Sequence, residues 1–237
     1  MIQPNDLIEK FRYALNNGWG YIWGTAGVKW TKEKQAALEK TTDEDRAMGR
    51  KYGSKWIGHT VADCSGLFSW AFKQLGGYMY HGSNTMWDKY CADKGELKKG
   101  KRADGKELLP GTAVFTRNKN TGKRGHVGLY IGNGKVIEAA GTIEGVITSK
   151  VDGKWVEWGE LKDVNYYGGD TPVPEGYAVV TGTRVALRKD RSTSSAVLTR
   201  VDTGKQVKLE NPPPEEWDYV SYQGKTGWMM KKFLKEG

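Results

Sequence analysis

Cysteine is scarce in this sequence. Its 237 residues include 2 cysteines, Cys64 and Cys91, which form neither a Cys-x-x-Cys pair nor a tight cluster with any of the 3 histidines. A disulfide framework and a structural zinc site both need several such ligands at short spacing, so neither is indicated. We expect no metal ion and no organic cofactor.

Long apolar runs are missing as well. No segment of the sequence approaches the roughly 18 consecutive apolar residues that a membrane-spanning helix needs. Residues 1–6 lack the basic segment with which an export signal begins. We therefore expect a protein that does not insert into a membrane and that is made in the cytoplasm without an export signal.

Acidic residues are outnumbered by basic ones. The sequence has 37 Lys and Arg against 28 Asp and Glu, a net charge of +9, and the excess lies in both halves of the chain. This balance favours an anionic partner such as nucleic acid, a cell-wall polymer or lipid headgroups, although solvated surface lysines would produce it too. Charge alone does not choose among these partners, and nothing indicates the oligomeric state.

The most informative stretch is residues 62–77, which predicts an α-helix beginning at Cys64. Apolar side chains recur on one face, at positions 67, 68, 71, 72 and 75, before Gly76-Gly77 ends the helix. Asp63 stands at the N-cap, where its carboxylate can accept a hydrogen bond from the first turn. Because a helix N-terminus carries partial positive charge, we expect the Cys64 thiol to ionise below its usual pKa of roughly 8.5 and to act as a nucleophile. The alternative is a buried structural cysteine.

A predicted β-hairpin carries the second candidate group. Two short strands flank residues 132–134, and the length of the loop decides which side chains share a face. A two-residue loop would place His126 and Glu138 on opposite faces. A three-residue loop, left-handed at Gly134, would place them on one face as diagonal neighbours and leave the other face apolar. We predict the three-residue loop, with Tyr130 opposite Val136.

These three side chains suffice for cysteine-dependent hydrolysis. Such an enzyme needs a thiolate, an imidazole that exchanges protons with it, and a polar group that orients the imidazole. Cys64, His126 and Glu138 can fill these roles in that order. The backbone amide of Cys64 is placed to stabilise an oxyanion.

Four motifs follow one another along the chain: Tyr21-Ile22-Trp23-Gly24, Asp63-Cys64-Ser65-Gly66, Pro110-Gly111 with the strand that follows, and Gly125-His126-Val127-Gly128. In this order they resemble the NlpC/p60 family of papain-like cell-wall cysteine peptidases. This resemblance implies an α+β fold and cleavage of the peptide stem of peptidoglycan, commonly between D-γ-glutamate and the diamino acid, lysine or diaminopimelate. It also implies that Tyr21, Asp63 and Ser65 belong to the substrate-binding site.

The sequence departs from the family pattern at two places. Glu138 stands where the family often has histidine, asparagine or glutamine, and a carboxylate there would favour a charged imidazole. Residues 25–61 form an insertion that is long for the family. Our hypothesis is that this insertion walls one side of the substrate groove.

The C-terminal part predicts a second domain. Residues 168–176 form a Gly/Pro-rich linker between a peptidase domain, residues 1–167, and a β-rich segment, residues 177–237. Turn residues at 203–204, 211–214 and 223–224 separate short strands, which is typical of a small all-β barrel. This segment resembles a bacterial SH3-like domain, and such domains attach hydrolases to the cell wall. Its aromatic residues Trp217, Tyr222 and Trp228 are either core or ligand contacts.

The sequence therefore favours a two-domain peptidoglycan hydrolase, and the lack of an export signal favours a phage-type endolysin that acts at the wall. One alternative is an N-acetylmuramoyl-L-alanine amidase with the same Cys-His site. Another is a non-catalytic wall-binding protein. Nucleic-acid binding has only the charge in its favour, so we expect none.

The remaining candidates receive structural interpretations. His59 is interpreted as a surface or packing residue, and His81, which no motif surrounds, as background. Cys91 is predicted within a short helix, residues 94–106 as an exposed loop, and a helix is predicted to begin at a capping box over residues 42–45.

Overall fold

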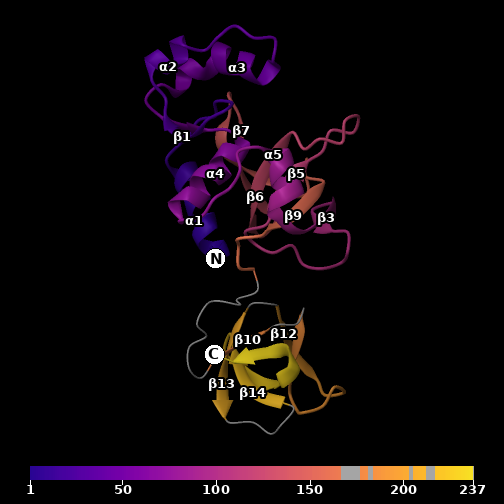
Figure 1. The fold of residues 1–237 in the computed structure, drawn as a ribbon. Coiled ribbons are helices and arrows are strands. Elements are labelled where there is room, and N and C mark those ends of the chain that lie inside the picture. The colour runs from indigo at the N-terminus through magenta and orange to yellow at the C-terminus, as the bar shows by residue number, and fades with distance from the viewer. Residues whose placement is uncertain (167–176, 181–183, 203–204, 212–216, 237) are drawn as a thin grey trace. The chain divides into compact units, whose positions relative to one another are not determined.

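The computed structural model describes residues 1–166, 177–180, 184–202, 205–211 and 217–236 (Figure 1). The chain divides into two compact units, Met1–Val164 and Asn165–Gly237. The predicted linker at 168–176, the turn at 203–204 and positions 212–214 of the next turn lie outside the described residues. The two units are described separately.

The first unit combines helices with an antiparallel sheet. Its helices are α1 (Pro4–Asn16), α2 (Lys32–Ala36), α3 (Glu44–Tyr52), the 3-10 helix η1 (Gly53–Trp56), α4 (Cys64–Gln74), α5 (Ser83–Thr85) and the π-helical turn η2 (Met86–Tyr90). Among the helices of the described residues, none has both the length and the apolar character that crossing a bilayer requires.

Nine strands complete the first unit. They are β1 (Ala26–Lys29), β2 (Thr60–Ala62), β3 (Cys91–Lys98), β4 (Lys101–Arg102), β5 (Ala113–Thr116), β6 (His126–Gly132), β7 (Lys135–Gly141), β8 (Gly145–Lys150) and β9 (Glu157–Leu161). Strands β1 and β2 pair with each other, and the others form one sheet in the order β4-β3-β9-β5-β6-β7-β8. The sequence predicts an α+β fold, and the first unit does combine helices with a β-sheet.

Helices α1 and α4 pack together beside the sheet (Figure 1). α1 begins at Pro4, whose fixed φ suits the first turn of a helix, and buries Leu7, Ile8 and Phe11. The ring of Phe11 meets that of Phe68 of α4 edge to face at 4.7 Å between centroids. Helix α4 also packs against β6 and β7. The helix that starts at Cys64 therefore lies beside β6, whose first residue is His126.

The β6-β7 hairpin has the predicted register but a different turn. Tyr130 pairs with Val136 as expected, yet Gly132 pairs with Lys135, so the loop contains only Asn133 and Gly134, with φ angles of 51° and 71°. A β-bulge between Tyr130 and Gly132 supplies the extra residue. The prediction of a three-residue loop is therefore wrong. Because of this bulge, His126 and Glu138 still lie on the same face of the sheet, as the longer loop would also have placed them.

This fold corrects two local predictions and confirms a third, the helix predicted at the capping box of residues 42–45. Cys91 is not helical, because η2 ends at Tyr90 and Cys91 begins β3. Residues 94–106 are not all loop, because β3 pairs with β9 and turns back into β4. The polar residues there lie on a strand near the sheet edge, where one face meets solvent. The N-cap of α3 is Asp43, whose side chain accepts a hydrogen bond from the Arg46 amide.

The second unit consists of strands and a short 3-10 helix within its described residues. They are β10 (Tyr177–Val180), β11 (Val185–Arg188), β12 (Val197–Val201), β13 (Gln206–Asn211), β14 (Trp217–Tyr222), β15 (Lys225–Met230), η3 (Lys231–Phe233) and β16 (Leu234–Glu236). The strands form one antiparallel sheet in the order β12-β11-β15-β14-β13-β10-β16. The predicted turn at Gln223-Gly224 is confirmed, since it joins β14 to β15 with positive φ at both residues. The SH3-like barrel stays a prediction.

The aromatic residues of this unit divide between core and surface. Trp217 is buried, and Tyr222 packs against a core of mostly aliphatic side chains. Trp228 is half-buried, with its ring 4.9 Å from that of Tyr219 and the Arg191 guanidinium 4.0 Å from its centre. Trp228 is therefore the aromatic residue of the predicted three that is available at the surface beside a cation.

Candidate active site

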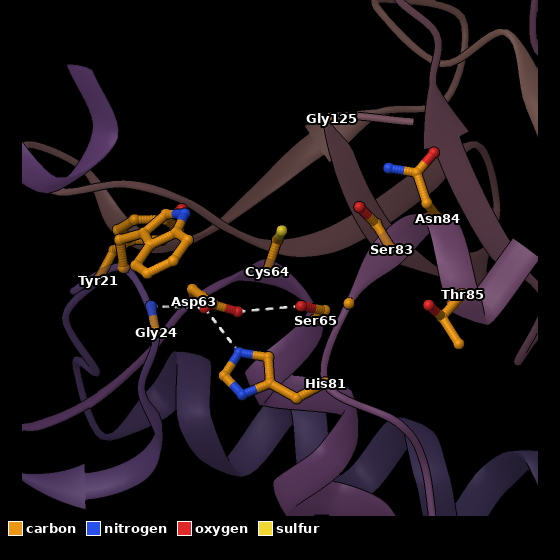
Figure 2. A pocket seen from close by; sticks show the side chains of 12 residues that line it. Tyr21, Gly24, Asp63, Cys64, Ser65, His81, Ser83, Asn84, Thr85 and Gly125 are labelled. Atoms are coloured by element: carbon orange, nitrogen blue, oxygen red, sulfur yellow. Dashed lines mark hydrogen bonds and ion pairs between the residues drawn. The ribbon is translucent and has the colours of Figure 1, made fainter. Parts of the chain in front are cut away.

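The Cys64 thiol lines a cavity of about 370 Å³ in the first unit. Cys64 is the first residue of α4 and is 8% exposed. Tyr21, Ser65 and His81 line the same cavity, with the sulfur of Cys64 standing between them and Gly125 (Figure 2). The structure thus brings together the sequence candidates Tyr21, Cys64 and Ser65.

Burial makes the Cys64 thiol a weak acid. Desolvation and the nearby Asp63 carboxylate raise its pKa from 9.0 to about 12, although backbone amides of Val127, Ser65 and Cys64 itself act in the opposite direction. The expectation of a lowered pKa at the helix N-terminus is therefore wrong. Exclusion of water outweighs the helix dipole at this position.

Asp63 caps α4 as predicted and organises the cavity wall. One of its oxygens, Oδ1, accepts the Gly66 amide at 2.7 Å and the Ser65 hydroxyl at 3.2 Å. The other oxygen, Oδ2, accepts the Gly24 amide at 2.7 Å and lies 2.7 Å from His81 Nε2 (Figure 2). These contacts occupy about as many sites as a carboxylate offers. A substrate amine would have to displace one of these donors to reach Asp63.

His81 is the site residue that sequence reasoning missed. Contrary to its interpretation as background, it lines the cavity and pairs with Asp63, and this hydrogen bond raises the pKa of His81. No motif marks it, because the contact arises only when the loop after α4 folds back over the helix start. His59, in contrast, is exposed and stands edge-on to Trp56 at 5.8 Å, as its interpretation as a surface residue expects.

Gly66 allows the helix start to approach the turn that carries Gly24. A Cβ at Gly66 would lie 2.0 Å from the carbonyl oxygen of Thr25, and this oxygen already accepts the Asp63 amide at 2.9 Å. Neither backbone can move without breaking the Asp63 contacts. Glycine is required here because of the close approach, since its φ is not in the left-handed region.

We expect Gly66→Ala to destabilise the protein by about 2 kcal/mol, the usual cost of forcing an extra carbon into a packed site. Gly49→Ala is the matched control, because Gly49 is also helical but a Cβ there meets side chains no closer than 3.8 Å. Urea unfolding of the two variants measures the difference. A Gly66→Ala protein as stable as the Gly49→Ala protein would contradict the close approach.

His126 and Glu138 form the second part of the site. His126 Nε2 lies 2.6 Å from Glu138 Oε2, and Lys154 Nζ reaches the same oxygen at 2.5 Å. The Glu138 side chain is completely buried. Burial raises its pKa, but hydrogen bonds from His126, Lys154 and Ser149 together lower it to about 2. The carboxylate is therefore ionised, so Nε2 must carry a proton and donate it, which leaves Nδ1 of a neutral His126 as a proton acceptor.

The strand that begins at His126 lies against the thiol. The amide of Val127 hydrogen-bonds Cys64, and Gly125 lines the cavity that contains the sulfur (Figure 2). Both chain neighbours of His126 thus meet Cys64 or its cavity. The His126 ring is held from another side by Trp155, which stacks on it at 5.4 Å and 18°.

A short network fixes the opposite wall of the cavity. The Ser83 hydroxyl and the Asn84 side-chain amide donate to the Arg124 carbonyl at 2.6 and 3.1 Å, and the Arg124 amide donates back to Asn84 at 2.9 Å. Arg124 lies two residues before His126, so this network positions the start of β6. No motif in the sequence marks this network. Among the described residues there is no group of three or more His, Cys, Asp or Glu side chains that could hold a metal ion.

Comparison with known sequences finds similarity that lies mainly in the first unit. Residues 48–160 match the sequence profile of the NlpC/P60 family. The chain is 31% identical over 140 residues to the murein DD-endopeptidase MepH of Escherichia coli K12, an alignment that covers 54% of this chain and 44% of MepH. The chain therefore spans less than half the length of this relative.

Solved structures similar to the chain include three mycobacterial proteins. A P60 domain of an antigen from M. avium subspecies paratuberculosis is 21% identical and covers 65% of this chain and 94% of that one, with a TM-score of 0.39. The peptidoglycan hydrolase RipB of Mycobacterium tuberculosis is 22% identical over 66% of each chain, with a TM-score of 0.36. RipD of the same organism, a non-catalytic NlpC/p60 domain protein, is 17% identical and covers 66% of this chain and 95% of that one, with a TM-score of 0.40. All three scores are below 0.5.

Proposed function

We propose that this chain, whose residues 48–160 match the NlpC/P60 family, is a cysteine endopeptidase that cleaves the peptide stem of peptidoglycan. The observation that carries the proposal is the approach of the β6 start to the Cys64 thiol, with His126 held by the ionised Glu138. The murein endopeptidase activity in the name of MepH supports the substrate class.

The high pKa of Cys64 sets the order of events. A thiol with a pKa of about 12 is neutral at physiological pH, so it does not wait as a thiolate. His126 Nδ1 takes the thiol proton while Sγ attacks the scissile carbonyl carbon. The resulting oxyanion is stabilised by the Cys64 amide at the helix start. His126 then donates this proton to the leaving amine, and the C–N bond breaks to leave a thioester on Cys64.

Water completes the cycle. His126 Nδ1 takes a proton from a water molecule, whose oxygen attacks the thioester, and the thiol leaves with that proton. Throughout these steps Glu138 keeps the proton on Nε2 and stabilises the imidazolium that forms. Glu138 therefore acts through His126 as a positioning residue. Tyr21, Ser65 and Asp63 shape the cavity in which the peptide binds.

We place the scissile bond between D-γ-glutamate and the diamino acid, lysine or diaminopimelate. The name of MepH favours a second candidate, a bond of the DD type. A cut between muramic acid and L-alanine, as an amidase makes, is the third possibility. The same thiol chemistry serves all three bonds, so the distinction depends on what the cavity binds.

The test is mass spectrometry of purified peptidoglycan digested by the full-length protein, with Cys64→Ala run in parallel. We expect fragments with a new amino group on the diamino acid and a new carboxyl group on D-glutamate. Free L-alanine N-termini would identify an amidase, and cleavage at cross-links with intact stems would identify the DD type. Absence of any new terminus from the wild-type digest would contradict the proposed function.

The same proposal extends to the whole chain. The second unit binds the wall polymer and keeps the peptidase near its substrate. Residues 177–237 contain 11 Lys and Arg against 7 Asp and Glu, and this positive charge attracts anionic polymers. The protein acts at the bacterial cell wall as a phage-type endolysin. No nucleic acid takes part.

A further inference from the structure

A second cavity of about 370 Å³ adjoins the one that contains Cys64. Its far wall comes from the long insertion, residues 25–61, whose helices α2 and α3 lie together at one end of the first unit (Figure 1). Trp23 and Gly24 line both cavities. A ligand that extends beyond the active site on this side would therefore pass the Trp23-Gly24 turn into the second cavity.

The turn between the cavities is fixed relative to the thiol. The Gly24 amide donates to Asp63 at 2.7 Å, and the Thr25 carbonyl accepts the Asp63 amide at 2.9 Å. Asp63 directly precedes Cys64, so any group bound beside Trp23 is held in a defined position relative to the sulfur. The Trp23 side chain is 40% exposed, which leaves contact area for a ligand.

The lining of the second cavity combines apolar surface with positive charge. Ile22 and Leu38 contribute aliphatic surface, while Lys40 and Arg46 contribute cations against the single acid Glu39. The Arg46 guanidinium lies 4.2 Å from the centre of the Trp23 ring. Among side chains that the structure describes, no carboxylate pairs with Arg46, although its planar fork is suited to bind one.

We propose that this second cavity is a subsite for the same peptide stem, in which Arg46 binds a free carboxylate while the stem packs against Trp23. The proposal rests on the proposed function. Linkage of D-glutamate through its γ-carboxyl leaves its α-carboxylate free, and the stem also ends in a carboxylate. The stem thus carries the negative charge that would balance the excess of cations in the cavity lining. The insertion then selects for substrates with a free carboxylate.

Arg46→Gln tests the subsite, with Lys51→Gln as the matched control. Lys51 is also exposed on α3, but it lies over Tyr52 and does not line the cavity. Steady-state kinetics of the full-length proteins are measured on a stem peptide with free carboxylates and on its carboxamide analogue. For Arg46→Gln we expect KM to rise about tenfold on the acid with kcat within twofold, and little change on the amide, as for loss of one charge-assisted hydrogen bond. Lys51→Gln should match the wild type on both.

Two results would overturn the subsite. One is an unchanged KM on the acid, and the other is an equal rise on acid and amide, which would make Arg46 merely structural. If the wild type cleaves neither peptide, the proposed function fails instead. Calorimetric binding of the acid peptide to Cys64→Ala, with and without Arg46→Gln, then decides the subsite separately. A tenfold loss of affinity supports it, and equal affinity or no binding to either protein rejects it.

Discussion

Cys64→Ala is expected to reduce the rate of wall hydrolysis by at least about 1,000-fold, because removal of a nucleophile eliminates the covalent route and leaves only binding and oxyanion stabilisation. The substitution removes one buried sulfur from a side chain that is 8% exposed, so the fold should survive. Release of soluble fragments from purified walls measures the rate. Pelleting of the variant with the same walls should be unchanged.

Cys91→Ala is the matched control for this experiment. Cys91 is also buried and its thiol also has a pKa raised to about 12, but it lies on β3 against Gly159 and does not line the cavity. Its variant should retain the wild-type rate per folded molecule. Equal activity of the Cys64→Ala and wild-type proteins would contradict the mechanism and favour a wall-binding protein without catalysis.

The local structure around the candidate site that the sequence predicts depends on short-range rules. The Asp63 cap and the period of apolar residues in α4 are local, so they placed Cys64 at the helix start. The pairing of Tyr130 with Val136 follows from keeping polar side chains on one face, and it brought His126 to Glu138 despite the wrong loop length. A bulge and a longer loop each add one residue to the hairpin, so both place the same side chains on the same face. The sequence of polar and apolar residues therefore cannot distinguish them.

The remainder depends on contacts between distant segments. His81 reaches Asp63 from a loop 18 residues away, and Asn84 holds Arg124 across 40 residues, with no motif at either place. The strand β3 is likewise set by its pairing with β9 and not by its own polar composition. Sequence patterns that describe one segment at a time carry no signal for such contacts.

Two opposing effects act on the pKa of Cys64, the helix dipole and burial, and burial is the larger of the two. A helix N-terminus stabilises a neighbouring negative charge by typically about 0.3–1 kcal/mol. The rise from 9.0 to about 12 that burial and Asp63 produce corresponds to about 4 kcal/mol in the opposite direction. Helix position is visible in the sequence, whereas burial is known only from the fold. The proposed mechanism therefore starts from a neutral Cys64 thiol and not from the thiolate that the helix position predicts.

Glu138→Gln is expected to lower kcat about 100-fold or more while KM changes little. A neutral glutamine can present its amide N–H to His126, which favours the tautomer with the proton on Nδ1, and that nitrogen then cannot accept the thiol proton. The buried carboxylate would also no longer stabilise the imidazolium. Stem-peptide kinetics measure the change. A rise in KM with kcat unchanged would instead indicate that Glu138 binds substrate and does not position His126.

The pH dependence of the stability of Glu138→Gln tests whether Glu138 is ionised in the folded protein. Since the pKa of Glu138 is lowered from 4.5 to about 2, its ionised form stabilises the folded state. This contribution, no more than about 3 kcal/mol, is fully present above pH 4.5 and is lost as the pH falls toward 2. The stability difference between wild type and Glu138→Gln should therefore shrink over that interval. A difference that is independent of pH would contradict an ionised Glu138.

Glu160→Gln separates catalysis from stability. Glu160 is also a buried acid of the same sheet, but it lies on β9 and pairs with Arg102 of β4 at 2.9 Å. Its loss should destabilise the protein, because it leaves the Arg102 charge less compensated in the interior, yet kcat of the folded protein should stay at the wild-type value. If both glutamine variants lowered kcat equally, general loosening of the sheet would explain the effect. A loss confined to Glu138→Gln identifies the orientation of His126 as the property on which the rate depends.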